Sequence, residues 1–365
     1  MTQKILILGG QGRIGSRVAA DVLAHTTATV TVTGRQRRAS HHPRQMPLQL
    51  DLDDRSGLHQ AIAVHDLVIH CAGPFSYRDD RVLLACIEAG VNYLDVADNP
   101  DYVHQAHRHR EAAQKAGITA ITSSGVFPGI SNSMARQGIE ALDQADEVHL
   151  SYVVAGSGGA GVTVMRTTFL ELQHPINAWI DGQRQQIPPY SQRQQVPFPP
   201  PYGPCPVYWF NTIEAATLPQ VFPLKTVITK FGSLPDIYNH LTWLMARLPG
   251  NWLQRPDTVE FLARVSYQMT QFSDRFSGTG IAMRVAVTGS HQQQPSRTVV
   301  TFCHDDTAAA VGAGTGLVAQ RLLAGFRYPG VWPVEQVLTT ADFLEGLHQR
   351  QLQTSIHTEC LENSL

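Results

Sequence analysis

The chain has 365 residues, of which 43% are hydrophobic and 16% are charged, a composition typical of globular proteins. A chain of this length rarely forms one compact core, so we expect two domains. Its 28 basic and 30 acidic side chains leave a formal net charge of -2. Binding to nucleic acid requires a basic excess that this balance excludes.

The cysteines are scattered along the chain, with neither paired spacing nor metal-ligand spacing. This pattern indicates reduced thiols rather than a disulfide framework. The first predicted strand begins at the fourth residue, which leaves no room for a signal peptide, and no apolar stretch approaches the length of a membrane span. We therefore expect a cytoplasmic protein. The cysteines are Cys71, Cys86, Cys205, Cys303 and Cys360.

The N-terminal stretch has the pattern of a dinucleotide-binding turn. Residues 5–8 are aliphatic and predict a strand buried on both faces, and residues 16–23 have helical spacing. Between them, Gly10, Gly12 and Gly15 permit a tight turn, a close approach to a pyrophosphate and close helix packing. The alternative is a plain strand-to-helix turn, but the order of strand, glycines and helix favours a cofactor site. The predicted contacts are Gly10, Gln11, Gly12, Arg13 and Ile14.

The end of the second predicted strand, residues 28–33, indicates which dinucleotide binds. Sites that prefer NAD usually place an acidic residue here to hold the ribose 2′-hydroxyl. This chain has Gly34 and Arg35 instead, and a guanidinium can pair with a 2′-phosphate through two hydrogen bonds. We therefore predict NADP as the cofactor. The following arginines are open to two interpretations, phosphate contact or a solvated loop; they are Arg37, Arg38 and Arg44.

Two further strand ends complete the predicted cofactor site. The third predicted strand, residues 48–53, ends in acids, and Asp51 and Leu52 are expected on the adenine side. The fourth, residues 66–70, is followed by small residues and a Gly-Pro turn, which let a cofactor pass close to the backbone. The expected contacts there are Cys71, Ala72, Gly73 and Pro74.

The rest of the first third continues the alternation of strands and helices. Six β-α repeats predict an α/β fold with a doubly wound parallel sheet, that is, a Rossmann domain. The remaining predicted helices cover residues 57–64, 80–89 and 100–116, and the remaining predicted strands cover 92–96 and 118–122.

Residues 71–75, 85–95 and 125–129 resemble the saccharopine dehydrogenase (reductase) family, and residues 307–323 with 330–333 resemble its return helix and closing segment. The resemblance implies an NADP-dependent Rossmann domain, a separate α+β domain for substrate and dimerisation, a homodimer, and reductive chemistry on a C=N bond or, in relatives, a C=C bond. Members that make saccharopine carry a cysteine just before the Gly-x-x-Pro-Gly turn. This chain has Ser123 and Ser124 there, so we expect a small-molecule substrate other than saccharopine.

After residue 146 the sequence no longer shows the regular alternation of strands and helices. We predict strands over 148–154, 279–288 and 298–302, with the last two paired, and a Gly-rich loop over 155–161 before a helix. Residues 182–206 are rich in Gln, Pro and Tyr, which favours an extended segment or a lid rather than core.

The domain boundaries follow from the need to cover both faces of a parallel sheet. The helix predicted over residues 308–317 is dense in glycine, and close packing against the first domain would compensate for the helix propensity that glycine loses. We predict a discontinuous Rossmann domain of residues 1–130 and 305–350, with residues 131–304 forming the substrate domain.

Candidate catalytic groups are few. Asp95 and Asp98 follow a predicted strand whose carboxyl end should face the nicotinamide, and Tyr77 follows the Gly-Pro turn, so each could hold or donate a proton. Asp98 could instead cap the next helix. Arg166 is a candidate for holding a substrate carboxylate, with a plain surface role as the alternative. The histidines at 104, 107 and 109 lack an acidic or cysteine partner at ligand spacing, so we expect no metal.

Two hypotheses of function follow. The first is an NADP-dependent oxidoreductase of the saccharopine dehydrogenase type. The second is a non-catalytic NADP-binding protein that senses redox state or serves a partner, because the sequence shows no unambiguous proton donor.

Overall fold

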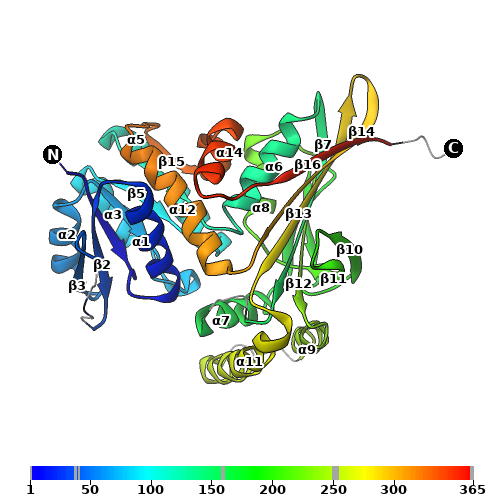
Figure 1. The fold of residues 1–365 in the computed structure, drawn as a ribbon, viewed down its shortest axis with the longest axis horizontal. Coiled ribbons are helices and arrows are strands. Elements are labelled where there is room, and N and C mark those ends of the chain that lie inside the picture. The colour runs from blue at the N-terminus through cyan, green and yellow to red at the C-terminus, as the bar shows by residue number, and fades with distance from the viewer. Residues whose placement is uncertain (1, 37–38, 40–41, 158–160, 249–254, 362–365) are drawn as a thin grey trace. The chain divides into compact units, whose positions relative to one another are not determined.

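The computed structural model describes residues 2–36, 39, 42–157, 161–248 and 255–361 and is drawn as a ribbon in Figure 1. The chain divides into two compact units. The first unit consists of Met1–Ile130 and Ala308–Arg350, and the second consists of Ser131–Thr307 and Gln351–Leu365. Each unit is built around its own sheet.

The first unit contains a parallel sheet with the strand order β15-β6-β5-β4-β1-β2-β3. The order reverses at β1, which pairs with both β2 and β4, as in a doubly wound fold. The edge strand β15 comes from the end of the chain and pairs with β6. The strands of this sheet are β1 (Lys4–Leu8), β2 (Thr29–Gly34), β3 (Gln45–Gln49), β4 (Leu67–His70), β5 (Asn92–Asp95), β6 (Thr119–Thr122) and β15 (Gly330–Pro333).

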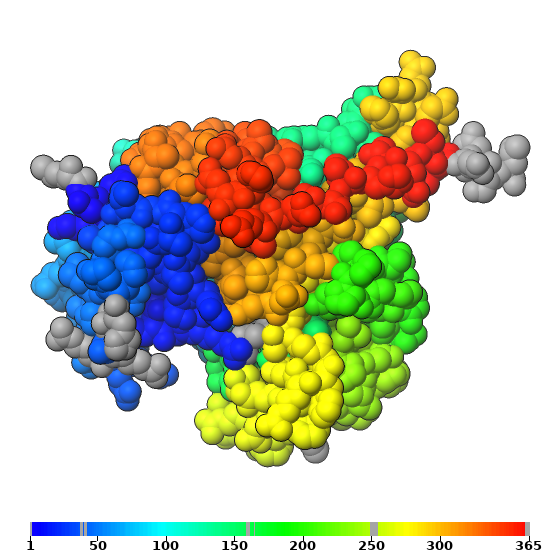
Figure 2. Space-filling view, viewed as in Figure 1, coloured from blue at the N-terminus to red at the C-terminus, as the bar shows by residue number. Residues whose placement is uncertain are grey.

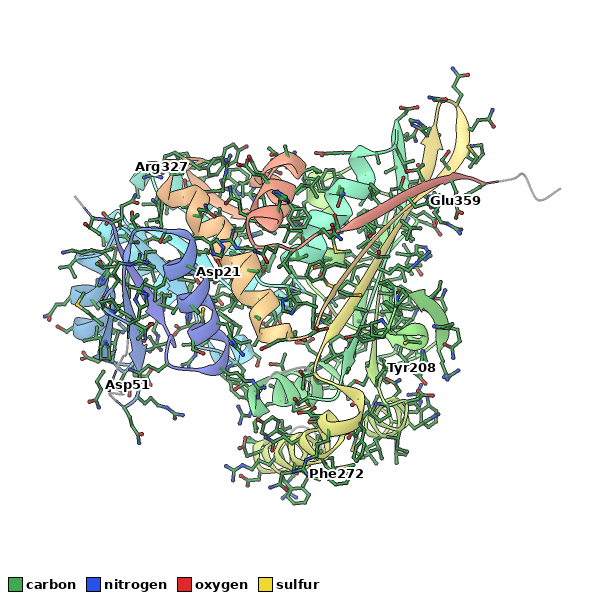
Figure 3. All side chains as sticks on the ribbon, viewed as in Figure 1. Asp21, Asp51, Tyr208, Phe272, Arg327 and Glu359 are labelled. Carbon is green, nitrogen blue, oxygen red and sulfur yellow. The ribbon has the colours of Figure 1, made fainter. Side chains whose placement is uncertain are left out.

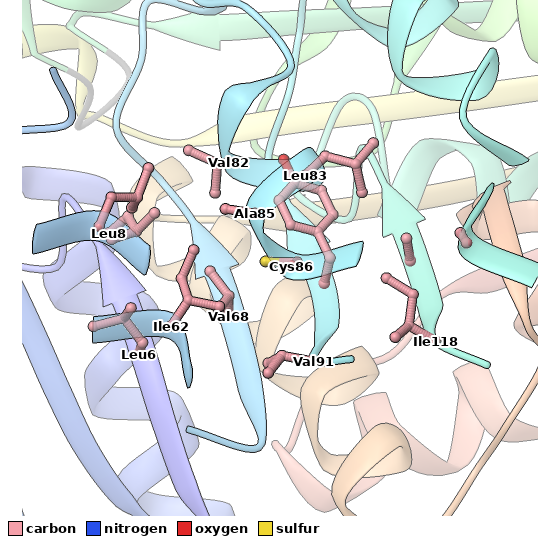
Figure 4. Packing of buried hydrophobic residues seen from close by; sticks show 14 of the residues in the cluster. Leu6, Leu8, Ile62, Val68, Val82, Leu83, Ala85, Cys86, Val91 and Ile118 are labelled. Carbon is pink, nitrogen blue, oxygen red and sulfur yellow. The ribbon is translucent and has the colours of Figure 1, made fainter. Parts of the chain in front are cut away.

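Aliphatic strands and amphipathic helices build the core of this unit. One cluster, shown in Figure 4, joins Leu6 and Leu8 of β1 to side chains of α2 and α3, among them Ile62 and Leu83, all of them buried. The helices are α1 (Arg13–His25), α2 (Arg55–Ala63), the short η1 (Phe75–Tyr77), α3 (Arg81–Ala89), α4 (Pro100–His107), α5 (Arg110–Ala116), α12 (Thr307–Leu323), α13 (Val334–Val337) and α14 (Thr340–Gln349).

The parallel Rossmann sheet is confirmed, and two predicted elements differ from those observed. The third strand lies at Gln45–Gln49 rather than 48–53, because Asp54 caps α2 by accepting a hydrogen bond from the Gly57 amide and residues 51–54 are needed for the turn. The single helix predicted over 100–116 is two helices, with α4 ending at His107 and α5 beginning at Arg110.

The glycine-dense helix α12 packs closely on α1. A Cβ at Gly312 would lie 2.8 Å from the Arg17 carbonyl oxygen, and a Cβ at Gly316 would overlap the Asp21 carboxylate. A Cβ at Gly314 would overlap the carbonyl oxygen of Gly125, beside the end of β6. Close packing against the first unit, which the sequence predicted for this helix, is confirmed.

The second unit contains a mixed sheet, since β12 runs parallel to β7 and the other described strand pairs are antiparallel. The main strand order is β10-β11-β12-β7-β13-β14-β16, and β8 pairs with β9 and β12. Its strands are β7 (Gln144–Ala155), β8 (Ile176–Ile180), β9 (Gln183–Ile187), β10 (Gln194–Phe198), β11 (Gly203–Trp209), β12 (Thr226–Leu234), β13 (Ile281–His291), β14 (Gln294–His304) and β16 (Ser355–Cys360).

The predicted pairing of the strands after residue 279 is confirmed by the β13–β14 hairpin. The expectation that residues 182–206 lie outside the core is wrong. Val196, Phe198 and Cys205 of the β10–β11 hairpin are buried against Val153 and Ala282 of the central strands. Successive side chains of a strand point to opposite faces, so alternate residues of this hairpin are buried although the average composition of the segment is polar.

Among the described helices of the second unit, the sequence predicted only α7 (Val162–Glu171), which follows the Gly-rich loop. The helices that it did not predict are α6 (Ile130–Glu140), α8 (Glu214–Val221), α9 (Ile237–Met245) and the 22-residue α11 (Pro256–Ser277). Among the described residues, no helix is both long enough and apolar enough to cross a bilayer.

Candidate active site

The glycine loop between β1 and α1 is anchored by the end of β2. The Gly9 amide donates a hydrogen bond to Thr33 Oγ1 (3.0 Å), and the Gln11 amide donates to the Thr33 carbonyl oxygen (3.1 Å). Gly9 has a φ of +74°, and a Cβ there would lie 2.9 Å from the Cα of Ala72. The loop is therefore held against both neighbouring strand ends. Thr33 is a supporting residue that glycine spacing alone did not reveal.

Each glycine of the triplet has its own steric reason. A Cβ at Gly10 would lie 2.8 Å from Val32 Cβ, and a Cβ at Gly15 would overlap the Gly9 carbonyl oxygen. At Gly12 a Cβ would meet only that same oxygen, at 3.1 Å, and Gly12 is exposed. Gly10 and Gly15 thus shape the turn, whereas Gly12 leaves its outer side open for a ligand that approaches the backbone.

The N-terminus of α1 fits an anionic group. Gly12 is the N-cap of α1, and it makes no side-chain capping hydrogen bond to the first turn. The amides of such a turn, together with the helix dipole, favour a phosphate. The Gln11 side chain lies over Gly34, and its buried Nε2 has no hydrogen-bond partner among the described residues. These features match the requirements of a dinucleotide pyrophosphate.

The end of β2 presents a cation to solvent. Arg35 is exposed, and its carbonyl oxygen accepts a hydrogen bond from Gln49 Nε2 (3.1 Å), which fixes the backbone. Arg37 and Arg38 lie outside the described residues. Arg44 has neither of the two roles considered for it, since its guanidinium donates to the carbonyl oxygens of Thr26, Ala28 and Leu23 at the end of α1. Its function is to cap α1.

The residues predicted on the adenine side lie in the turn after β3. Asp51, which is labelled in Figure 3, is exposed, and its carboxylate accepts a hydrogen bond from the Asp53 amide (3.1 Å). Leu52 is half-buried, and its carbonyl oxygen accepts from Arg81 Nη1 (3.3 Å).

The carboxyl end of β4 supports the glycine loop from the other side. Residues 71–74 are half-buried, and the Cys71 amide donates to the Leu8 carbonyl oxygen (2.8 Å). Arg78 of the following turn donates from Nε to the Ala72 carbonyl oxygen (2.7 Å). His70 is fully buried, and burial lowers its pKa to about 3, so the ring is neutral. Its Nδ1 accepts from the Ala72 amide (3.3 Å), so Nε2 carries the proton.

Asp95, at the end of β5, is the hub of a buried hydrogen-bond network. Its Oδ1 accepts from the amides of Ala97 (3.0 Å) and Ser123 (2.7 Å), and its Oδ2 accepts from the Tyr93 hydroxyl (3.0 Å). The Tyr93 and Tyr102 hydroxyl oxygens are 2.8 Å apart. Burial raises the pKa of Asp95 to about 6, although the three donors counteract part of that shift. This carboxyl can therefore hold a proton near neutral pH.

The network fixes the end of β6. Ser124 donates from its amide and from Oγ to the Asp95 carbonyl oxygen (2.9 and 2.7 Å). Ser123 has a φ of 63°, a conformation that costs energy for a residue other than glycine. Its buried Oγ has no hydrogen-bond partner among the described residues. The Asp95 carboxylate thus holds Ser123 in a strained conformation, which only the adjacency of β5 and β6 makes possible.

The other two catalytic candidates lie apart from this buried network. Asp98 is half-buried, and its charge contributes to the raised pKa of Asp95. It is not the cap of α4, because Asn99 accepts the hydrogen bond from the Tyr102 amide (3.0 Å). Tyr77 ends η1 with 56% of its surface exposed. The structure places both near the carboxyl ends of β5 and β4, where a parallel sheet binds its ligands.

The remaining polar candidates have internal partners. Arg166 donates from Nε and Nη2 to Glu260 Oε2 (2.9 and 2.5 Å), so its guanidinium already holds a carboxylate. His107 shares a hydrogen bond with Thr122 Oγ1 (3.0 Å), and His109 pairs with Asp80 (2.6 Å). Within the described ranges, no three His, Cys, Asp or Glu side chains form a group that could hold a metal.

The N-terminal part of the chain matches a known domain family. Residues 5–121 match the family described as "Saccharopine dehydrogenase NADP binding domain". This match covers β1 to β6, which carry the glycine loop, Arg35 and Asp95.

Two curated relatives extend the likeness. The chain is 27% identical over 305 residues to "Carboxyaminopropylagmatine dehydrogenase" of Synechocystis, which covers 75% of each protein. It is 27% identical over 176 residues to "Carboxynorspermidine synthase" of Vibrio alginolyticus, which covers 44% of this chain and 42% of the relative. The match thus spans less than half the length of the Vibrio protein.

One solved structure resembles the whole chain. It is the apo saccharopine dehydrogenase (L-Glu forming) of Saccharomyces cerevisiae, with a TM-score of 0.69 and 14% identity. The superposition covers 98% of this chain and 100% of the yeast chain. At that identity the likeness supports the fold.

Proposed function

Because the chain belongs to the saccharopine dehydrogenase-like family and contains its NADP-binding domain, we propose that it is an NADP-dependent oxidoreductase. In this proposal it transfers a hydride to or from a C=N bond of a small metabolite other than saccharopine, with a C=C bond as the alternative. The observation that carries the proposal is the glycine loop, whose uncapped helix and open Gly12 fit a pyrophosphate.

The names of the two curated relatives support the choice of substrate class. Carboxynorspermidine and carboxyaminopropylagmatine are both carboxylated amines. A secondary amine of this kind is the reduced form of an imine, so we propose a carboxylated imine as the substrate. The serines at 123 and 124, where saccharopine-forming members have a cysteine, support a substrate other than saccharopine.

In this proposal, different residues bind different parts of NADPH. The amides at the start of α1 hold the pyrophosphate, with Gln11 and the backbone of residues 71–74 on either side. Arg35 pairs with the 2′-phosphate. Bound NADPH supplies the hydride. The exposed position of Arg35 and its fixed backbone support its role in selecting NADP.

Proton handling is assigned to the carboxyl end of β5. Asp95 is the proposed proton store, because its pKa of about 6 allows both protonation states near neutral pH. Through its hydrogen bond to the Ser123 amide it also positions the end of β6. Asp98 and Tyr77 are the proposed partners that exchange this proton with substrate or solvent, because both are more exposed than Asp95.

We further propose that the protein acts in the cytoplasm as a homodimer. The scattered cysteines support a reducing compartment. The family resemblance of the sequence supports dimerisation. Analytical ultracentrifugation of the full chain tests the oligomeric state, and a monomer at all concentrations contradicts the homodimer.

Steady-state turnover tests the activity. The full chain with NADPH is offered a panel of carboxylated aldehydes and 2-oxo acids, each mixed with mono-, di- and polyamines that form imines. We expect oxidation of NADPH with at least one pair, and formation of the matching secondary amine by mass spectrometry. Tight NADPH binding without turnover across the panel contradicts the enzyme and favours the redox sensor. Turnover of saccharopine contradicts the proposal that the substrate is a metabolite other than saccharopine.

A further inference from the structure

The turn after the Gly-Pro pair holds an arginine at the carboxyl end of β4. Arg78 follows η1 directly, and its Nε donates a hydrogen bond to the Ala72 carbonyl oxygen (2.7 Å). A Cβ at Gly9 of the glycine loop would lie 2.9 Å from Ala72 Cα, so Ala72 borders that loop. The guanidinium is therefore anchored at the edge of the sheet at which parallel strands bind their ligands.

The packing of Phe75 fixes this turn to the core of the first unit. The Arg78 amide donates a hydrogen bond to the Phe75 carbonyl oxygen (3.0 Å). The buried Phe75 ring packs edge to face on two others, with 4.9 Å between ring centroids for Tyr102 and 5.0 Å for His70. Burial, and after it the positive charge of Arg78, lowers the pKa of His70, which places the cation near the end of β4. The position of Arg78 is thus determined by the folded core.

The charged groups that follow Arg78 in the sequence are engaged with other partners. Arg81 donates to the Asp79 carboxylate from Nε (2.7 Å) and Nη2 (2.8 Å). The Asp80 carboxylate lies 2.6 Å from His109 Nε2. Arg78 is half-buried, yet within the described part of the chain no carboxylate pairs with it and no group accepts from its Nη1 or Nη2. It is therefore a fixed cation whose outer donors are available to a ligand.

The outer edge of this guanidinium fits an anion that presents two oxygens. Because Nε is bound to Ala72, the two terminal nitrogens are left to pair side by side with a carboxylate or a phosphate. A half-buried cation without a counter-ion is costly, so the binding of an anion stabilises it. Arg166, the arginine that the sequence offered for a substrate carboxylate, has no such edge, because it is already paired with Glu260.

From these observations we propose that Arg78 binds the carboxylate of the substrate and thereby selects carboxylated substrates over those without a carboxylate. This inference rests on the proposed function, because it assigns a binding group to the carboxylated imine. The alternative anion is a phosphate of NADP. In the proposed arrangement the amides at the start of α1 and the guanidinium of Arg35 already bind the phosphates, whereas Arg78 adjoins Tyr77, a proposed proton partner of the substrate. The substrate is therefore the favoured source of the anion.

Calorimetric titration of the full chain, saturated with NADP, tests the assignment. The probes are two carboxylated secondary amines, N-ethylglycine and N-ethyl-β-alanine, and their amides, which lack the carboxylate. We expect the parent to bind at least one acid at least tenfold more tightly than its amide, and Arg78→Gln to lose this preference. Arg78→Lys keeps the charge without the planar fork, so its affinity for the acid should lie between those of the parent and of Arg78→Gln.

The matched control is Arg55→Gln, which removes an exposed arginine of the first unit and should bind the acid like the parent. Arg55 lies at the start of α2, which Figure 2 shows in blue at the surface of the molecule. Thermal unfolding and NADPH binding of each variant report whether the turn and the cofactor site are intact. In turnover, Arg78→Gln should raise KM for the carboxylated substrate at least tenfold, about 1.4 kcal/mol, with a much smaller change in kcat.

Three outcomes would overturn the assignment. The parent could bind no acid more tightly than its amide, or Arg78→Gln could retain the preference of the parent. Alternatively, Arg78→Gln could weaken NADPH binding and leave acid binding unchanged, in which case the arginine holds a phosphate of the cofactor. A failure of the proposed function has a different result, in which NADPH turnover is absent although the acid still binds through Arg78.

Discussion

The Asp21 carboxylate of α1 and the Arg350 guanidinium after α14 form a bidentate ion pair across 329 residues of sequence, with N–O distances of 2.6 Å and 2.9 Å. The two side chains are only 12% and 2% exposed. Arg350 Nη1 also donates to Gln320 Oε1 of α12 (3.2 Å). The pair therefore connects α1, the helix that begins at the glycine loop, to α12 and α14 of the C-terminal return segment. In Figure 3 Asp21 is seen on α1 beside α12.

Removing Arg350 should destabilise the first unit. Burial raises the pKa of Asp21 and the arginine only partly counteracts it, so Arg350→Met leaves a buried carboxyl without its cation. We expect a loss of about 3 kcal/mol in the free energy of unfolding, measured by urea denaturation. The loss should increase with pH, since the unpaired carboxyl is costly only when ionised.

Two further variants distinguish the loss of this buried ion pair from the loss of any arginine side chain. The double variant Asp21→Asn/Arg350→Met should recover part of the loss, because no uncompensated charge remains. Arg264→Met removes an exposed i,i+4 pair with Glu260 and should cost less than about 1 kcal/mol. A cost for Arg350→Met no larger than that of Arg264→Met contradicts the structural role of the pair.

Gly12 and Gly15 should respond differently to the same added methyl group. Gly15→Ala places Cβ into the Gly9 carbonyl oxygen and should lower the midpoint of thermal unfolding. Gly12→Ala brings Cβ to 3.1 Å from the Gly9 carbonyl oxygen, a tight contact that a small shift can relieve, so it should lower the midpoint much less than Gly15→Ala. It should nevertheless weaken NADPH binding at least tenfold by blocking the phosphate approach. Calorimetry and fluorescence titration measure the two effects. Equal NADPH affinity in Gly12→Ala and the parent contradicts the proposed cofactor position.

Arg35 should determine the choice between the two nicotinamide cofactors. We expect the parent to bind NADPH at least tenfold more tightly than NADH, about 1.4 kcal/mol. Arg35→Ala should abolish most of this preference and leave NADH binding nearly unchanged, because only the 2′-phosphate pairs with the guanidinium. Arg55→Ala, an exposed arginine at the start of α2, is the control and should keep the preference. Equal affinities in the parent would refute the role of Arg35.

Asp95 should impose a pH dependence on stability with a definite sign. Its folded-state pKa of about 6 lies above the ordinary value of an aspartate. Between about pH 4 and pH 6 the folded state retains a proton that the unfolded state has released, so stability falls as the pH rises and is level above that window. Asp95→Asn lacks this titration. Its stability relative to the parent should increase by at most about 3 kcal/mol across the window.

Unfolding curves of the parent and of Asp95→Asn at matched pH values measure this difference. The subtraction cancels the other carboxylates, which both proteins share. A constant difference from pH 4 to pH 8 means that Asp95 does not titrate there, and its proposed role as a proton store fails with it.

Local patterns predicted the cofactor side of the fold. The aliphatic run before the glycine triplet and the β-branched residues 29–34 fix β1 and β2 through contacts that are near in sequence. The third strand begins three residues and ends four residues earlier than predicted, because Asp54 caps α2 and residues 51–54 form the turn before that helix. The composition of residues 182–206 was misleading because hairpin burial depends on alternate positions and not on the average.

The catalytic side depends on contacts that the sequence does not display. Asp95 gains its raised pKa from complete burial and its donors from β6, which requires the adjacency of two strands. The strain at Ser123 has no sequence signal, since a left-handed serine resembles any other serine. Helix α11 could have been detected from the spacing of its apolar residues, but no helix was predicted there.

The last prediction concerns the return segment of the first unit. We propose that residues 305–350 complete the NADP-binding domain, since β15 pairs with β6 and α12 packs on α1. A chain that ends at residue 304 should lose NADPH affinity and bind a hydrophobic dye, although it keeps the whole glycine loop, because β6 and α1 lose their apolar cover. A chain that ends at residue 350 is the matched control, since it loses only β16 and the residues beyond it. It should bind NADPH like the full chain. If the chain that ends at 304 remains monodisperse and binds NADPH normally, the return segment is not part of the cofactor domain.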